Sequence, residues 1–298
     1  MREKAKKIPK SMLIGWTFLL PSILLYAVFM IYPLLRTFYL SFTSWSGFGE
    51  AQYIGPDNFF SLFADTMFLR ALKNTLYFAI VSGILSVLAG ILMAWLNLFI
   101  RKMEGQITRT ILFVPNMIAP TITGLLFMFI LTEDIGLLNN ILRAVGMDRL
   151  ATAWLVNPAT VRPSIVVAQI WRQFGLTMIL CFAGFQGIPA GLIESAQIDG
   201  ASTFKVFTGI MLPLIKPQIE LATMFTLLGG LKIYDSVVSL TGGGPARQTV
   251  VLPMYIIENA FTYSKFGYAS AMCVAFLFIV LAFIILLRFL FRGEKIEM

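Results

Sequence analysis

Six long runs of predominantly apolar residues dominate the chain, and polar segments separate them. Each run is about as long as the roughly 20 residues that an α-helix needs to cross a hydrocarbon core about 30 Å thick. The runs cover 12–32, 74–100, 107–131, 164–186, 218–240 and 267–291. Backbone amides in hydrocarbon must be hydrogen-bonded within their own element, and these runs do not alternate as barrel strands do. The pattern predicts an all-α membrane protein of about six transmembrane helices.

The first apolar run follows a lysine-rich segment, 1–11, and the two together could be read as a cleavable secretory signal. The run 12–32 is nevertheless long enough to span a membrane, and it continues into 33–36 without the small residues of a cleavage site. We therefore expect an uncleaved first span, a short cytoplasmic segment at 1–11 and a single transmembrane domain over 12–298.

Basic residues indicate which side of the membrane each connecting segment faces, because Lys and Arg concentrate in cytoplasmic segments close to helix ends. Taken together, the segments 1–11, 101–109, 187–217 and 288–298 carry 13 basic residues, against eight in the other connecting segments, which are longer overall. These other segments, which also carry several acids, are 33–73, 132–163 and 241–266. The asymmetry predicts that both termini are cytoplasmic. On the outer side, 58–60 and 137–142 could form short helices that serve as a lid, a docking surface or plain connectors.

The composition agrees with a membrane protein and narrows its chemistry. Hydrophobic residues make up 58% of the 298 positions and charged residues only 13%, against roughly 25% charged in soluble domains. The net charge of +8 could suggest nucleic acid, but the basic clusters beside apolar runs are explained by membrane orientation. Histidine is absent and the two cysteines, Cys181 and Cys273, lie inside apolar runs, so we expect neither a disulfide framework nor a metal site.

Several polar residues interrupt the apolar runs and are candidates for a solute path. Polar side chains within spans are costly and usually face a bundle interior or a water-filled cavity. The candidates are Asn116, Trp171, Gln173, Lys232, Tyr234 and Asp235. On one helix, Lys232 and Asp235 would share a face and could neutralise each other. Packing contacts with another subunit would explain any one of these residues equally well.

The segment 187–217 between the fourth and fifth runs reads as an interrupted helix. Pro189 suits a helix start, Gly200 permits a sharp bend, and a second helical piece is expected over 201–213. Such a helix-turn-helix, polar on one side and apolar on the other, is well shaped to sit in a groove on a partner protein.

This segment resembles the cytoplasmic signature of permease subunits of binding-protein-dependent ABC importers. That signature reads Glu-Ala-Ala, three residues, Gly, nine residues, Ile, one residue, Leu-Pro. The matching residues are Glu194, Ser195, Ala196, Gly200, Ile210, Leu212 and Pro213. Only the middle alanine departs, where Ser195 is another small residue that still suits a close helix contact.

Looser motifs extend the resemblance over most of the chain. They are Leu240–Pro245 followed by Thr249, the stretch Gly267–Ala271, and an opening with Leu20-Pro21, Tyr32-Pro33 and Ser41-Phe42. These are similar to permeases of the maltose and multiple-sugar type, and specifically to the first member of a permease pair.

The resemblance implies the fold of a type I ABC importer permease and a non-catalytic role. In that family the loop between the fourth and fifth spans acts as a coupling helix inserted into an ATPase subunit. The chain lacks a Gly-x-x-x-x-Gly-Lys-[Ser/Thr] phosphate loop, so ATP and Mg²⁺ are expected in a partner and no cofactor in this chain. The coupling residues that the resemblance assigns are Glu194, Ser195, Ala196, Asp199, Gly200, Ala201 and Phe204.

The resemblance also implies partners and a location. The expected partners are a second permease, two ATPase subunits and an extracytoplasmic solute-binding protein, all at a prokaryotic cytoplasmic membrane. The expected solute is a sugar, for which aromatic faces and amides make a suitable lining. A non-sugar solute such as a polyol phosphate remains open, and so, less favoured, does a secondary transporter or channel.

Overall fold

The computed structural model describes residues 10–291, and side-chain environments from Trp16 onward. The remaining residues, 1–9 and 292–298, lie outside the described part. Most of the predicted N-terminal segment 1–11 therefore lies outside it, as do six of the basic residues behind the predicted orientation: Arg2, Lys4, Lys6, Lys7, Arg292 and Lys295.

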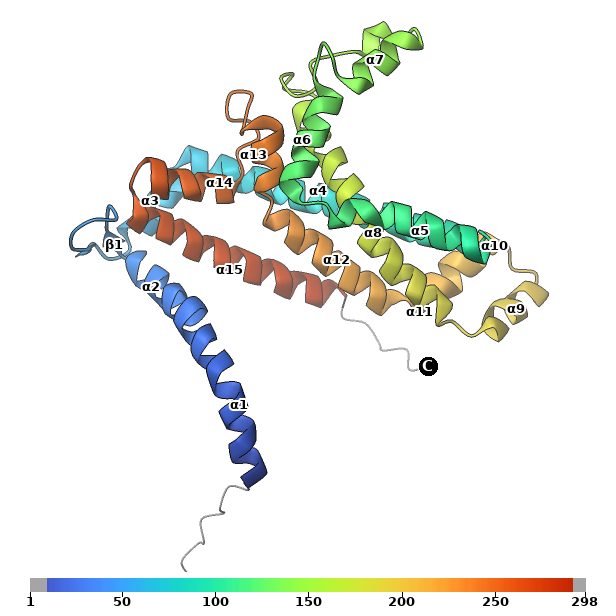
Figure 1. Ribbon diagram of the computed structural model, residues 1–298, viewed down its shortest axis with the longest axis horizontal. Coiled ribbons are helices and arrows are strands. Elements are labelled where there is room, and N and C mark those ends of the chain that lie inside the picture. The colour runs from blue at the N-terminus through green and yellow to red at the C-terminus, as the bar shows by residue number, and fades with distance from the viewer. Residues whose placement is uncertain (1–9, 292–298) are drawn as a thin grey trace, which may run out of the picture. The chain divides into compact units, whose positions relative to one another are not determined.

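The described chain is mostly helical (Figure 1). Its first part contains α1 (Lys10–Tyr26), η1 (Ala27–Ile31), α2 (Tyr32–Leu40), β1 (Thr43–Ser44), β2 (Gln52–Tyr53), α3 (Asp57–Ala64), α4 (Thr66–Asn97), α5 (Lys102–Met117), α6 (Pro120–Leu131), α7 (Leu137–Ala144) and η2 (Asp148–Leu150). Its second part contains α8 (Val161–Gln186), α9 (Ala190–Ile198), α10 (Thr203–Val206), η3 (Phe207–Met211), α11 (Leu212–Leu214), α12 (Lys216–Leu231), α13 (Asp235–Thr241), α14 (Leu252–Ile257), η4 (Glu258–Thr262) and α15 (Phe266–Leu290).

Four helices are long and apolar enough to cross a membrane, and two bent helix pairs raise the number to as many as six. The four are Trp16–Leu40, Thr66–Asn97, Val161–Gln186 and Phe266–Leu290. The all-helical membrane fold is thus confirmed, and α3 and α7 confirm the short helices predicted at 58–60 and 137–142.

The third apolar run, 107–131, is not one helix as the sequence suggested. It divides into α5 and α6, whose axes differ in direction by 101° (Figure 1). Pro120 opens α6, and Ala119 before it has an extended backbone with ψ 139°. The residue before a proline is disfavoured in the helical conformation, so the break follows from local sterics that hydropathy does not register.

The fifth run, predicted over 218–240, also needs correction. Its helix α12 ends at Leu231, and Tyr234 has a non-helical backbone with φ −142° before α13 begins at Asp235. At its other end, α12 is joined to the preceding helical segment, which runs to Leu214, through a bend of 73°. Lys232 and Asp235 therefore lie on either side of a break and do not share a helix face. Within the described residues no ion pair joins them.

The chain divides into two compact units, and the smaller comprises residues up to Ala64 together with 256–278. Its strands pair antiparallel, with Thr43 opposite Tyr53. The Asn58 side-chain amide donates to the carbonyl oxygens of Ser41 and Thr43, at 2.9 Å each. Nearby, the Gly267 amide donates to the Trp45 carbonyl oxygen at 3.1 Å. These bonds hold the smaller unit together.

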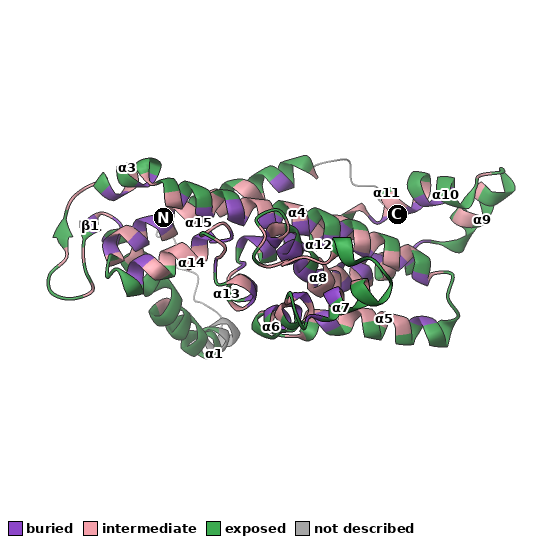
Figure 2. Ribbon diagram, turned by 90° about the horizontal axis from the view of Figure 1, so that it is seen from above, coloured by how far each residue is buried: buried purple, intermediate pink, exposed green. Residues whose placement is uncertain are grey.

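The larger unit, 65–255 with 279–298, is built around α4, α8 and α12. Buried residues concentrate along these helices (Figure 2). Glycines let the backbones approach closely: a Cβ at Gly230 would lie 2.5 Å from the Ala79 Cα, and one at Gly90 would lie 2.5 Å from the Thr177 Cβ. Small residues at helix contacts are typical of membrane bundles, where packing replaces the hydrophobic effect as the cohesive force.

Candidate functional site

The 187–217 segment forms a tight helical turn at the end of α8 (Figure 1). Helix α9 starts directly after Pro189 and ends at Ile198. Gly200 then takes φ +81°, its amide donates to the Gln197 carbonyl oxygen at 3.0 Å, and the Ala201 amide donates to the Ala196 carbonyl oxygen at 2.9 Å. This pair of bonds is the Schellman arrangement, which favours glycine at the left-handed position. The predicted interruption at Gly200 is confirmed.

The second helical piece begins slightly later than the sequence suggested. Ser202 caps it by accepting a hydrogen bond from the Lys205 amide at 3.4 Å, so α10 starts at Thr203 rather than at Ala201. The helical path continues through η3 and α11 to Leu214, one residue beyond the expected end at Pro213.

One face of the turn points away from the helical bundle, and the described residues of this chain leave it uncovered. Ile198 is 86% exposed and Phe204 is 65% exposed. Glu194 and Ser195 of α9 are also exposed, as is Asp199 directly after that helix. Two large apolar side chains with acids beside them form a surface suited to a partner. Ile198 was not among the predicted contact residues, although an apolar residue beside Asp199 was a usable signal.

The inner face of the turn packs on the membrane helices. Ala196 and Ala201 are half-buried, and both contact the buried cluster that includes Phe207. The small side chains at these two positions thus let the turn lie close to the helices beneath it. The Ser195 hydroxyl donates within its own helix, to the Leu192 carbonyl oxygen at 3.2 Å.

Phe207 links the turn to three membrane helices. Its ring stacks on Trp95 of α4 with centroids 4.5 Å apart and an angle of 28° between the planes. It belongs to a cluster with Met178 and Cys181 of α8 and with Ile215, next to the start of α12. A movement of the turn therefore has a direct, close-packed route into α4, α8 and α12.

The polar candidates on α8 lie in the bundle and make specific contacts. Gln173 is 5% exposed, and its Nε2 donates to Oε1 of Gln169 at 3.2 Å. Asn116 donates from Nδ2 to the Arg172 carbonyl oxygen at 3.4 Å. Trp171 packs edge-to-face on Phe127 with centroids 5.5 Å apart. The structure thus places Asn116 against α8, the helix that carries Trp171 and Gln173.

Several buried polar atoms of this region have no hydrogen-bond partner in the described structure. They are Ser86 Oγ of α4 together with Arg172 Nε, Gln173 Oε1 and Thr177 Oγ1 of α8. A buried polar atom without a partner costs about 1–3 kcal/mol. These atoms are unused hydrogen-bonding capacity within the membrane part of the chain.

The break between α5 and α6 lies next to the break between α12 and α13. The Ser236 hydroxyl at the start of α13 donates to the Pro120 carbonyl oxygen at 3.4 Å, where α6 begins. The position of a Cβ on Gly124 in α6 is filled by the Ser239 side chain. Lys232 and Asp235 beside the breaks are exposed, and Tyr234 is half-buried. Non-helical backbone at membrane depth is tolerated where it is buried in protein or lines an aqueous cavity.

The glycine motif at 242–245, directly after α13, forms a tight turn, and the segment that follows it is hydrogen-bonded to α4. The Thr249 hydroxyl donates to the Gly244 carbonyl oxygen at 2.8 Å. The Asn74 amide of α4 donates to the carbonyl oxygens of Gln248 and Val250, at 2.8 Å each. Hydrogen bonds explain why a threonine follows the glycines at this spacing.

Residues 86–295 match the family described as the binding-protein-dependent transport system inner membrane component. The chain belongs to this family. The match covers most of the chain and includes α8, the Gly200 turn and α12. The resemblance inferred from the Glu194–Pro213 motif is confirmed, and a secondary transporter or channel is not favoured.

Individual relatives agree with the family. The permease is 33% identical to a probable ABC transporter permease of Bacillus subtilis over 97% of this chain and 100% of that protein. It is 34% identical to the lactose transport system permease of Rhizobium radiobacter over 86% of both chains. It also superposes on a chain of a bacterial ABC transporter that imports alginate, with a TM-score of 0.82, 26% identity and coverage of 95% and 96%. The ABC importer permease fold is thereby confirmed.

Proposed function

We propose that this permease is one of two transmembrane subunits of an ATP-driven carbohydrate importer. A second, different permease supplies the other half of the path, and an extracytoplasmic binding protein delivers the solute. Two ATPase subunits bind ATP and Mg²⁺, so this chain itself binds no cofactor and catalyses no reaction. The complex lies in a prokaryotic cytoplasmic membrane, with both termini of the permease in the cytoplasm.

The exposed turn around Gly200 is the observation that carries this proposal. Ile198 and Phe204 present apolar surface with Glu194 and Asp199 beside them. An apolar centre with a polar rim is the usual composition of a protein interface. We infer that the ATPase binds this exposed surface of the turn, and that closure of the ATPase on ATP displaces the turn.

The packing beneath the turn supports transmission of that displacement. Phe207 stacks directly on Trp95 of α4 and belongs to the same buried cluster as Met178 of α8. Protein interiors are close-packed and yield little under strain. A rigid-body shift of α9 and α10 therefore moves α4 and α8, rather than being absorbed locally.

A carbohydrate is the favoured solute for two reasons. The relatives whose names state a solute carry lactose, starch degradation products or other saccharides. In this chain, α8 carries the amide of Gln173 and the indole of Trp171, and the amide of Asn116 bonds to the backbone of the same helix. Amides can hydrogen-bond hydroxyl groups and an aromatic face can cover sugar C–H groups.

Reconstitution decides the class of transporter. We expect the permease to copurify with an ATPase and a second permease, and we expect ATP hydrolysis to rise when the binding protein and its sugar are added. The measurement is phosphate release in proteoliposomes alongside uptake of labelled saccharides. A self-sufficient homo-oligomer that transports without ATP would refute the proposal.

A Gln173→Leu substitution tests the path through the bundle. Leucine is of similar size and removes both the partnerless Oε1 and the Nε2 bond to Gln169, whose Oε1 still accepts from Arg172, so the effect on the stability of the fold should be small. Loss of one hydrogen bond to a sugar hydroxyl, worth about 0.5–1.5 kcal/mol, should lower uptake by about three- to tenfold at a limiting sugar concentration. Gln186→Leu, at the exposed end of α8, is the control. Unchanged uptake by Gln173→Leu would remove this residue from the path.

A further inference from the structure

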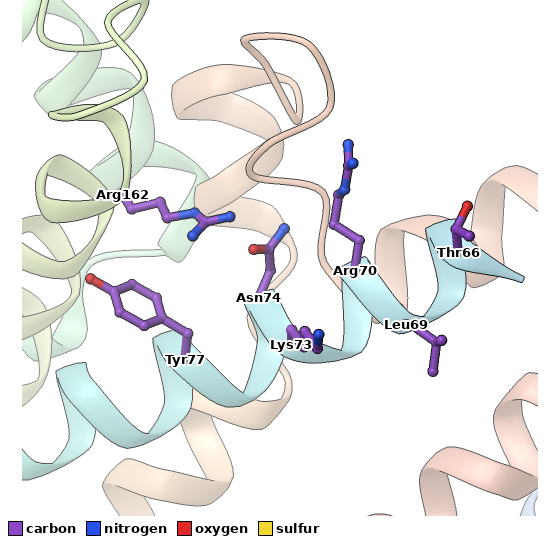
Figure 3. A pocket seen from close by; sticks show the side chains of 7 residues that line it. All are labelled: Thr66, Leu69, Arg70, Lys73, Asn74, Tyr77 and Arg162. Atoms are coloured by element: carbon purple, nitrogen blue, oxygen red, sulfur yellow. The ribbon is translucent and has the colours of Figure 1, made fainter. Parts of the chain in front are cut away.

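A cavity of about 520 Å³ lies between the first turns of α4 and the start of α8 (Figure 3). Three of its lining residues are basic: Arg70, Lys73 and Arg162. The lining contains no acid. Figure 3 shows Arg162 reaching from α8 toward α4 above Tyr77, while Arg70 and Lys73 come from adjacent turns of α4.

The three cations are poorly compensated within the described chain. Arg70 and Lys73 are exposed, and neither has an ion pair there. The guanidinium of Arg162 lies 6.0 Å from the Tyr77 ring centroid and donates from Nη2 to the Gln248 carbonyl oxygen at 3.5 Å, yet its buried Nε has no partner. Like charges that share a cavity repel each other, so a bound anion would relieve the repulsion.

The nearest acid in the sequence is engaged elsewhere. Asp65 caps α4 by accepting hydrogen bonds from the amides of Met67 and Phe68, at 2.8 and 3.1 Å. Its other carboxylate oxygen accepts from the Tyr255 hydroxyl at 2.8 Å. It is not part of the cavity lining, so the cavity keeps its positive charge.

Membrane orientation does not explain these basic residues. In the proposed topology the cavity lies on the outer side, where the positive-inside tendency disfavours Lys and Arg. Helix α4 has 32 residues and is about 48 Å long, against about 30 Å of hydrocarbon. Its first turns therefore have the length to stand at the level of the lipid headgroups.

We propose that this cavity binds an oxyanion, that is, a carboxylate or phosphate group. Arginine and lysine are the usual partners of such groups, and arginine can bind them with two parallel hydrogen bonds. The group can be carried by an anionic phospholipid or by an acidic solute. For the lipid, the exposed side chains of Ile80 and Ile84 continue the Lys73 face of α4 toward the membrane interior. Placing the cavity outside rests on the proposed function.

The test compares the assembled complex with and without cavity charges. The variants are the single substitution Lys73→Gln, at an exposed residue without described contacts, and the triple substitution Arg70→Gln, Lys73→Gln, Arg162→Gln. Arg149→Gln, an exposed arginine elsewhere on the same side, is the matched control. One arm measures retention of phosphatidylglycerol against phosphatidylcholine by native mass spectrometry, and the other measures binding of glucuronate.

We expect one anion to bind, and its affinity to fall about tenfold in Lys73→Gln and further in the triple variant. Added salt should weaken binding, and Arg149→Gln should match the wild type. Retention of phosphatidylglycerol alone identifies a lipid site, and glucuronate binding identifies a solute site. The proposal would be overturned if the wild type and the triple variant bound phosphatidylglycerol and glucuronate equally. It would also be overturned if the complex with Lys73→Gln lost its partner subunits.

A labelling control separates this proposal from the topology on which it rests. Cysteines placed at Arg149 and Ser195 should react with a membrane-impermeant maleimide from opposite sides of the membrane. A reversed pattern would refute the orientation, whereas a correct pattern with no anion binding would refute the oxyanion site alone.

Discussion

Replacing Gly200 by aspartate is expected to abolish solute uptake while the permease still inserts into the membrane. Gly200 has φ +81°, and, apart from its two adjacent residues, no atom of the described residues lies within 4 Å of a Cβ at this position. The left-handed backbone costs a residue with a side chain only about 1–2 kcal/mol, which is too little to unfold a membrane bundle. The new carboxylate instead stands on the exposed turn beside Asp199, where we place the ATPase. Uptake of labelled solute and the amount of permease in the membrane are measured together.

Gly146→Asp provides a matched control for this prediction. Gly146 also has a positive φ, +75°, and no neighbour within 4 Å of a Cβ. It follows α7, far along the chain from the Gly200 turn, so the same strain and the same charge are introduced elsewhere. Normal uptake is expected. Full transport by Gly200→Asp, or equal loss in both variants, would contradict a coupling role for the turn.

Replacing Gly230 by alanine is expected to destabilise the bundle at the contact between α12 and α4. Its Cβ would lie 2.5 Å from the Ala79 Cα and 3.3 Å from the Ala79 carbonyl oxygen. Both are backbone atoms of α4, so α4 and α12 must move apart. Overpacking of this kind costs about 1–3 kcal/mol. A fall of several degrees in the unfolding midpoint of the purified complex is the expected observation, together with reduced uptake.

Gly229→Ala separates overpacking from the general effect of alanine in a helix. Gly229 precedes Gly230 in α12, and its nearest neighbour would be Gln173 Nε2 at 3.7 Å, an ordinary contact. Both substitutions gain about 1 kcal/mol of helix propensity. Gly229→Ala should therefore leave the unfolding midpoint unchanged or raise it. Equal effects of the two substitutions would show that α4 and α12 are not packed as described.

The seven predicted coupling residues divide between two faces of the turn. Glu194, Ser195, Asp199, Gly200 and Phe204 are exposed, as contact residues should be. The other two, Ala196 and Ala201, pack inward on the buried cluster that contains Phe207, the residue whose ring stacks on Trp95 of α4. In the proposed mechanism, these two alanines hold the turn against the membrane helices. The exposed Ile198 supplies apolar contact to the ATPase instead.

The amino-acid sequence by itself determined the class of the protein. Long apolar runs are unambiguous because hydrocarbon excludes unpaired backbone and charge. The turn at Gly200 was equally readable, since a left-handed cap depends on a few adjacent residues and glycine fills it best. Family membership followed from the spacing between Glu194 and Pro213. All of these features are local in the chain.

Only the tertiary structure decided where the membrane helices break and which side chains meet. Hydropathy averages over a window, so it merged α5 with α6 and carried the fifth span beyond Leu231. Lys232 and Asp235 were paired on a helix that does not exist. The meeting of Arg162 with Arg70 and Lys73 depends on the packing of α4 against α8. These residues are about ninety positions apart in the chain. Helix packing brings them together, and no local sequence pattern predicts which helices pack.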